Sequence, residues 1–266
     1  MEIEGEPLST MLDLGFRGDV KVVPEFLEKI KKKKWIGSGE KYAGKYGKAY
    51  PRDYYGIPKI KIGKVNFYNP ILEKENIDSH KDSVFVEGGG EPSPPEPGTL
   101  GWHIFGKSNL FLDLQNSLIA LCDSVETLDK EGYSKSTFIK IPLHTERGFL
   151  ECEGLYNDQP LRFVLDSGCT WNLLNTPAAS TLDELIWDPQ VIAESSVAIG
   201  ERDFGKMEFR KVPIPLPIHV DAVLGMNFLS KHRVFIDFNN GYLYFAPSDK
   251  VIAVSKAPPS KNRSAL

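Results

Sequence analysis

An aspartate with the surroundings of a reactive acid lies in the second half of the chain. The apolar run Phe163–Leu165 leads into Asp166, Ser167 and Gly168, and a second apolar run follows. This pattern predicts a buried strand that ends in a tight turn. A carboxylate in such a place is costly without partners, so Asp166 is a candidate for acid–base chemistry. The simpler interpretation is a carboxylate that only caps the turn.

The first half of the chain repeats this pattern. Glu6–Gly15 aligns without gaps on Gln159–Gly168, and the two segments share Pro, Leu, Leu, Asp and Gly. Asp13 is therefore the counterpart of Asp166. Two further pairs of segments match in the same order, Leu100–Phe105 on Leu224–Leu229 and Leu110–Asn116 on Val234–Asn240. The ordered matches indicate two related halves.

The combination of these motifs resembles the retropepsin-like aspartic peptidases. Their half-site is an Asp, a Thr or Ser and a Gly after two apolar residues, followed later by two apolar residues and Gly, here Val223–Gly225. The resemblance covers residues 136–247 well and 4–121 moderately. It implies that the later element packs beneath the Asp loop, through Leu100 and Gly101 in one half and Leu224 and Gly225 in the other. It also implies a supporting active-site loop of Leu14, Gly15, Ser167, Gly168 and Thr170.

The resemblance implies an aspartic endopeptidase in which Asp13 and Asp166 share one water. Such carboxylates lie about 3 Å apart, one protonated and one ionised, because two like charges at that distance do not both ionise readily. Tandem halves place both acids in one chain, so a monomer is expected. The expected partner is a polypeptide in extended conformation, and no metal or organic cofactor is implied.

Leu14 departs from the family pattern. The family has Thr or Ser at this position, whose hydroxyl hydrogen-bonds between the two Asp loops, and Ser167 supplies only the other half of that clasp. Asp13 could then be a turn carboxylate in a degenerate lobe. Two alternatives follow: a catalytically silent binding or scaffold protein with the same fold, or an enzyme active only as a homodimer through Asp166.

The first half also differs in length. It begins without a counterpart of the strand predicted at Thr137–Leu143, and its Asp-to-Gly spacing is longer. The Gly- and Tyr-rich segment 37–50 is a candidate flap over the substrate, with an ordinary surface loop as the alternative. Segment 86–98 has the composition of an extended loop. Either the lobe is trimmed or the chain is shortened.

Short alternating runs predict an all-β fold of two pseudo-symmetric retropepsin-like β-barrel lobes with a few short helices. Asn239–Gly241 is a hairpin signal, Pro24–Lys33 has helical spacing, and short turns are expected after Gly101 and Gly225. The predicted division is a first lobe over 1–122, a polar linker over 123–136, a second lobe over 137–247 and a tail over 248–266.

Composition narrows the function classes. The chain of 266 residues has a formal net charge of −4, which argues against a general nucleic-acid binder. Segment 17–64 is nevertheless strongly basic, which predicts a solvated face or, less simply, a surface for an acidic partner. Three cysteines without a CxxC pair and five histidines without metal spacing give no metal site. With no membrane span and no signal sequence, we expect a soluble chain, cytoplasmic if complete and exported if a leader has been removed.

Overall fold

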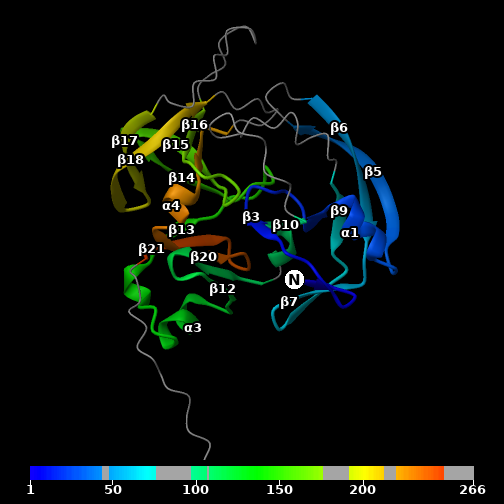
Figure 1. Cartoon of the computed structure of the whole chain (residues 1–266). Helices are drawn as coiled ribbons and strands as arrows, with labels where there is room; N and C mark the ends of the chain where they lie inside the picture. Colours follow the sequence, from blue (N-terminus) through cyan, green and yellow to red (C-terminus); the bar gives the residue numbers. More distant parts are fainter. Residues whose placement is uncertain (44–47, 76–96, 107, 176–191, 213–219, 249–266) are drawn as a thin grey trace, which may run out of the picture.

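The computed structural model describes residues 1–43, 48–75, 97–106, 108–175, 192–212 and 220–248. Strands dominate, and the helices are short (Figure 1). The prediction of an all-β fold with a few short helices is therefore confirmed.

The strands of the first half form two sheets. A four-stranded sheet has the order β2-β1-β7-β8, with bounds Glu6–Pro7, Glu2–Ile3, Lys59–Ile62 and Val65–Tyr68. A six-stranded sheet has the order β3-β10-β4-β9-β6-β5, with bounds Met11–Asp13, Gly98–Gly101, Val20–Val22, Ile71–Lys74, Lys48–Gly56 and Lys34–Ala43. Apolar side chains of the latter sheet, such as Val20, Leu72 and Leu100, face the core.

The second half closes into a barrel of six strands. Its order is β14-β15-β19-β16-β18-β17, with bounds Glu151–Tyr156, Gln159–Leu165, Ala222–Leu224, Leu173–Asn175, Arg202–Val212 and Ile192–Ile199.

The same strand pairings recur at the matched segments of the two halves. β3 runs parallel to β10, with Leu12 opposite Leu100, and β15 runs parallel to β19, with Leu165 opposite Leu224. β10 then pairs antiparallel with β4, as β19 does with β16. The sequence repeat thus corresponds to a repeated local topology around both aspartates.

A fourth group of strands, a five-stranded sheet, joins the halves. This sheet has the order β12-β11-β20-β21-β13, with bounds Leu118–Leu121, Leu110–Asp113, His232–Asp237, Tyr242–Pro247 and Ile139–Pro142. Phe111 of β11 lies opposite Phe235 of β20, its counterpart in the sequence alignment, so the register is symmetric about this pair. Figure 1 shows the green strand β12 of the first half in the same layer as the orange strands β20 and β21. Among the described strands, β12 has no outer neighbour where β21 has β13, which matches the strand missing from the first half.

The helices refine several predictions. α1 spans Pro24–Lys29 rather than the expected Pro24–Lys33. The 3-10 helix η2 (Trp102–Phe105) and helix α4 (Met226–Leu229) follow Gly101 and Gly225, as predicted. The predicted hairpin at 239–241 connects β20 and β21. Two other short 3-10 helices are η3 (Leu114–Asn116) and η4 (Lys135–Thr137).

The segment predicted as a polar linker is partly structured. Residues Val125–Lys130 form helix α3, and its Val125 and Leu128 are buried against Phe111 and Phe235 of the joining sheet. Most of the predicted loop at 86–98, and the tail from residue 249, lie outside the described residues.

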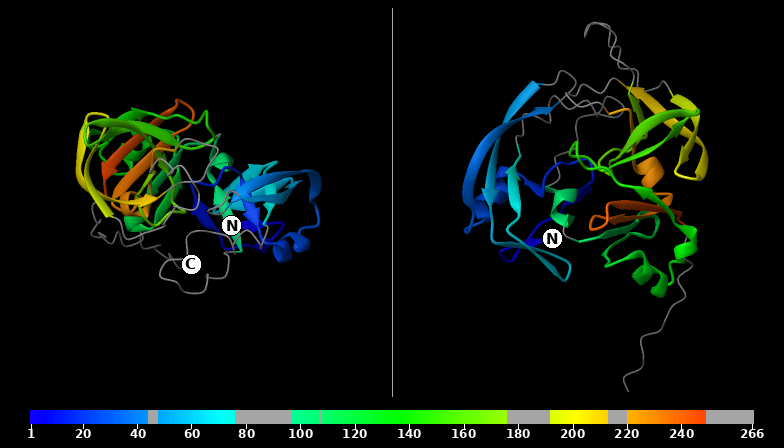
Figure 2. Two further views of the ribbon diagram at one scale, coloured as in Figure 1. Left: turned by 90° about the horizontal axis from the view of Figure 1, so that it is seen from above. Right: turned by 180° about the vertical axis from the view of Figure 1, so that it is seen from behind.

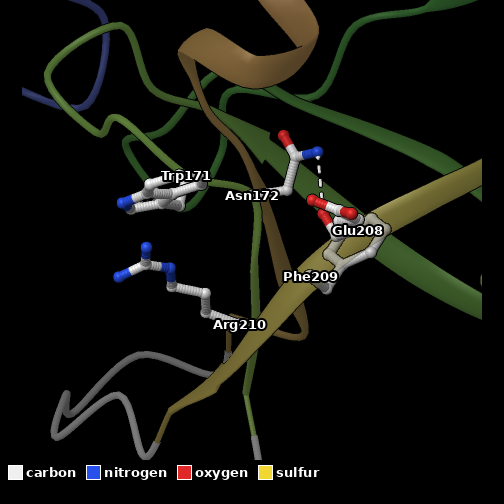
Figure 3. A pocket seen from close by; sticks show the side chains of 5 residues that line it. All are labelled: Trp171, Asn172, Glu208, Phe209 and Arg210. Atoms are coloured by element: carbon white, nitrogen blue, oxygen red, sulfur yellow. Dashed lines mark hydrogen bonds between the residues drawn. The ribbon is translucent and has the colours of Figure 1, made fainter. Parts of the chain in front are cut away.

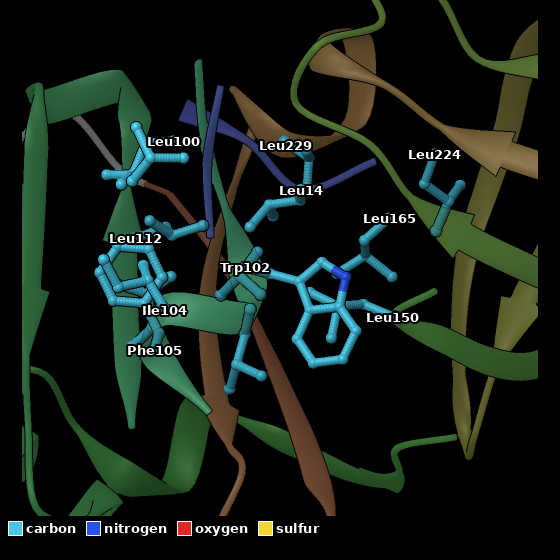
Figure 4. Packing of buried hydrophobic residues seen from close by; sticks show 14 of the residues in the cluster. Leu14, Leu100, Trp102, Ile104, Phe105, Leu112, Leu150, Leu165, Leu224 and Leu229 are labelled. Atoms are coloured by element: carbon cyan, nitrogen blue, oxygen red, sulfur yellow. The ribbon is translucent and has the colours of Figure 1, made fainter. Parts of the chain in front are cut away.

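One apolar cluster runs through both halves. It includes Leu14 and Leu100 from the first half and Leu165, Leu224 and Leu229 from the second (Figure 4). Because these side chains pack in a common core, the two aspartate loops are held against each other by the fold. Figure 2 shows the two groups of strands from above and from behind.

Candidate active site

The two aspartates lie in loops of the same design. In each loop the Asp carboxylate accepts a hydrogen bond from the backbone N–H of the glycine two residues later. The distances are 2.9 Å from Gly15 N to Asp13 Oδ1 and 2.8 Å from Gly168 N to Asp166 Oδ1. Each carboxylate is therefore fixed by its own turn at the end of a strand.

The glycine of each loop lies against the aspartate of the other loop. A Cβ atom added at Gly15 would lie 2.5–2.7 Å from the carboxyl atoms of Asp166, and one added at Gly168 would lie 2.7–2.9 Å from those of Asp13. Real Cβ atoms do not approach so closely, so a larger residue at either position would have to displace the opposing carboxyl group. The reciprocal contact brings the two carboxyl groups into one site, and the glycines leave room for that approach.

This closeness perturbs ionisation. Burial and the neighbouring charge of Asp13 raise the pKa of Asp166 well above its ordinary value, and a hydrogen bond between the two side chains adds to the effect. Both causes act against a second negative charge in the site. The pair is therefore suited to hold a single proton at a pH where an isolated Asp holds none.

Ser167 links the two loops. Its Oγ accepts a hydrogen bond from Leu14 N at 3.0 Å and donates one to Leu12 O at 2.7 Å. The side chain at the matching position, Leu14, is fully buried in the common core, as Figure 4 shows. One half of the clasp is thus polar, while apolar packing replaces the other half.

Replacement of Ser167 by Ala should loosen this link. The change leaves Leu14 N–H and Leu12 C=O without their partner, so we expect the free energy of unfolding to fall by about 1–3 kcal/mol. Ser230→Ala is a matched control, because the Ser230 hydroxyl donates only to Met226 O within its own helical turn. Urea denaturation of both variants measures the difference, and equal losses would contradict a special role for Ser167.

The glycines of the later motif fit beneath the loops for a steric reason. A Cβ added at Gly101 would lie 2.1 Å from Gly18 O, and one added at Gly225 would lie 2.3 Å from Trp171 O. In both halves the obstructing carbonyl belongs to the fifth residue after the Asp. Leu100 and Leu224, next to these glycines, are buried in the core. Gly101 and Gly225 thus lie against the backbone of the segments that follow the two Asp turns, and the predicted role of all four residues in supporting the loops stays a prediction.

Two supporting residues were not identified from the sequence. Asn172 Oδ1 accepts from Gly225 N at 3.0 Å, and its Nδ2 donates to Glu208 O at 3.2 Å, a bond drawn in Figure 3. Asp19 stands at the same place in the first half, where its backbone O accepts from Gly101 N and its Oδ2 accepts from Ile71 N. Both residues lie six positions after an Asp, and this equal spacing is the signal that could have indicated them.

Thr170 and Cys169 follow the second Asp turn and differ in exposure. Thr170 is exposed, and its backbone O accepts from Asn227 N. Cys169 is buried with its Sγ 3.1 Å from Trp171 O, and burial raises its thiol pKa to about 12, which matches a packed residue rather than a nucleophile. Beside it, the Arg210 guanidinium stacks 3.7 Å from the centre of the Trp171 ring (Figure 3).

The predicted flap lies in a long hairpin. Segment 37–50 belongs to strands β5 and β6, with residues 44–47 outside the described part. Figures 1 and 2 place this blue hairpin at the outer edge of the first half. Its action as a flap stays a prediction.

Within the described ranges, no group of three or more His, Cys, Asp or Glu side chains is arranged to hold a metal ion. No helix in the same part of the chain is long and apolar enough to cross a membrane. In comparisons with known proteins, neither a family model nor a curated protein matches this chain.

Proposed function

We propose that this protein is an aspartic endopeptidase with Asp13 and Asp166 as its catalytic pair. The observation that carries the proposal is the reciprocal contact in which Gly15 lies against Asp166 and Gly168 against Asp13. That contact requires two carboxyl groups from separate loops to share one site. The repeated pairing of β3 with β10 and of β15 with β19 supports two retropepsin-like lobes around it.

The geometry is suited to direct attack of water on a peptide carbonyl. The ionised carboxylate takes a proton from the water as general base, while the protonated partner donates to the carbonyl oxygen. Burial and the charge of Asp13 raise the pKa of Asp166, so the pair retains one proton at a pH where an isolated Asp holds none. The substrate binds extended between the lobes, with its backbone hydrogen-bonded to strand edges.

The presence of both acids in one chain favours a monomeric enzyme over a homodimer built through Asp166. A second copy is not needed to supply the other carboxylate, because Asp13 already contacts Gly168. Analytical ultracentrifugation of the active protein distinguishes the two arrangements. Activity that rises with dimer formation would favour the homodimer.

The proposal is tested by cleavage of mixed peptide libraries between about pH 3 and pH 8, the range in which carboxyl pairs titrate. We expect cleavage that an active-site inhibitor of aspartic peptidases blocks. If no inhibitor-sensitive cleavage occurs, the enzyme proposal fails and a silent two-lobed binding protein replaces it. The buried Leu14 in place of a hydroxyl is the observation that favours this second candidate.

Leu14→Thr separates the two candidates further. The change removes apolar packing from a fully buried site, so we expect a loss of about 1–3 kcal/mol in stability. It also restores the second hydroxyl of the clasp, so peptidase activity per folded molecule should stay equal or rise. Activity assays below the melting temperature measure this, and a large loss would show that the Leu14 side chain has a positive role in catalysis.

A further inference from the structure

A basic groove lies in the first half, away from the aspartates. It has a volume of about 460 Å³ and is lined by Lys31 and Lys32, which follow α1, and by Lys59 and Lys61 of β7. Glu2 and Glu4 also line it. These lysines belong to the basic segment 17–64, which the proposed peptidase function does not use.

The two acids in the groove are engaged within the protein. Glu4, at the turn between β1 and β2, accepts hydrogen bonds from Lys31 N and Lys32 N at 2.9 Å or less. Glu2 pairs with Lys61, with 3.7 Å between Oε2 and Nζ. In the described part of the chain, no carboxylate forms an ion pair with the ammonium groups of Lys31, Lys32 or Lys59. The groove therefore presents excess positive charge.

An exposed aromatic residue stands on the same face. Tyr68 of β8 lies directly opposite Lys59 in the antiparallel pair, so the two side chains project from one side of the hairpin. Tyr68 is 71% exposed, while Phe67, its neighbour, packs against the core from the other side. Trp35, at the start of β5 immediately after the lysine run 31–34, is 58% exposed. The register thus places a lysine and an exposed aromatic ring on one side of the β7–β8 hairpin, and a second exposed aromatic residue directly follows the lysine run in the sequence.

We propose that this face binds the surface of a bilayer that contains anionic phospholipid. Clustered lysines are attracted to anionic headgroups. Exposed Trp and Tyr side chains favour the boundary between headgroups and acyl chains. The four groove cations are all lysines, without the arginines that bidentate recognition of nucleic-acid phosphates and bases favours. The chain's net charge of −4 also disfavours general binding to nucleic acid.

The basic face lies at one edge of the first half. In Figure 1, β7 is at the lower edge of this half, whereas β5 and β6 extend to its upper edge. Docking through β7, β8 and the end of α1 therefore directs the upper side away from the bilayer. This inference does not depend on the proposed peptidase function.

The test is co-sedimentation of the full chain with phosphatidylcholine vesicles, with and without phosphatidylserine. We expect binding only to the anionic vesicles, and weaker binding at high salt because surface charges are screened. Lys31→Glu with Lys32→Glu should lower the partition coefficient by at least about 25-fold, since each lysine near an anionic surface contributes about a factor of five. Tyr68→Ala should lower it by a smaller factor, with little dependence on salt.

Lys206→Glu is the matched control. Lys206 is an exposed lysine on β18 in the other half. Lys206→Glu changes the net charge of the protein by as much as each of the two groove substitutions does, but it should change vesicle binding less than about twofold. Thermal melts establish that all variants are folded. The proposal is overturned if anionic vesicles are not bound, if neutral vesicles bind equally, or if Lys206→Glu lowers binding as much per charge. Binding of a DNA duplex or an acidic peptide in place of vesicles would overturn it in favour of that partner.

Discussion

Asp13→Asn and Asp166→Asn should each lower kcat/KM for peptide cleavage by about 10⁴-fold or more, as single losses from a catalytic unit do. Asn nearly preserves the shape of Asp and can still accept from the glycine N–H of its turn, so the loops should stay in place. It can no longer exchange a proton with water or substrate. Both variants should therefore fold and fail to turn over, as measured with the best library substrate.

Asp203→Asn is the control for this experiment. Asp203 also accepts a hydrogen bond from the glycine two residues later, at 2.7 Å from Gly205 N, but it is an exposed residue near the start of β18 in the second half. The variant repeats the local change without touching the pair, and its activity should equal that of the wild type. Loss with Asp166→Asn alone would make Asp13 a bystander and favour the homodimer. Unchanged activity in both site variants would refute the catalytic pair.

Short-range patterns explain why the aspartate loops could be predicted. Asp13 and Asp166 each follow an apolar strand, and a glycine lies two residues later in both loops. In each half this glycine lies where a Cβ atom would meet the carboxyl group of the other loop. The repeated glycine in the sequence therefore reflects a steric contact in the folded protein. The same reasoning extends to Gly101 and Gly225, where a backbone carbonyl occupies the place of a Cβ.

Other features depend on contacts between residues far apart in the sequence. α1 ends at Lys29 although helical spacing continues to Lys33, because Ile30 enters the core and Glu4 takes the amides of Lys31 and Lys32. The spacing of apolar residues in this segment does not reveal these contacts with Glu4 and the core. Likewise α3 forms from a polar segment because Val125 and Leu128 meet a sheet face that both halves build together.

The burial of Leu14 shows a different kind of limit. Its sequence position indicated a lost hydroxyl, whereas the structure shows an apolar side chain packed in the common core. The clasp survives through the opposite half, because Ser167 contacts the backbone of residues 12 and 14 rather than the missing hydroxyl. The structural effect of Leu at position 14 therefore cannot be judged from the sequence alone, because it depends on which atoms the neighbouring loop contacts.

The ionisation of Asp166 should also appear in the pH dependence of stability. Its pKa is raised in the folded protein, so the folded state keeps a proton that the unfolded chain releases near pH 4. The contribution to stability is complete below pH 4 and is lost as the pH rises through the folded pKa. Asp166→Asn removes this loss, so at pH 7 we expect the variant to be more stable than the wild type by on the order of 1–2 kcal/mol, allowing for partial solvent screening.

Urea denaturation at pH 3 and pH 7 measures this effect. At pH 3 the wild-type carboxyl is protonated in both states, so the advantage of Asp166→Asn should nearly vanish. Asp203→Asn should leave the difference between the two pH values unchanged, because Asp203 is exposed on β18 and does not belong to the aspartate pair. If Asp166→Asn were equally destabilising at both pH values, the carboxyl would act only as an acceptor for Gly168 N–H. The two acids would then not share a proton, and the proposed mechanism would lose its general acid at neutral pH.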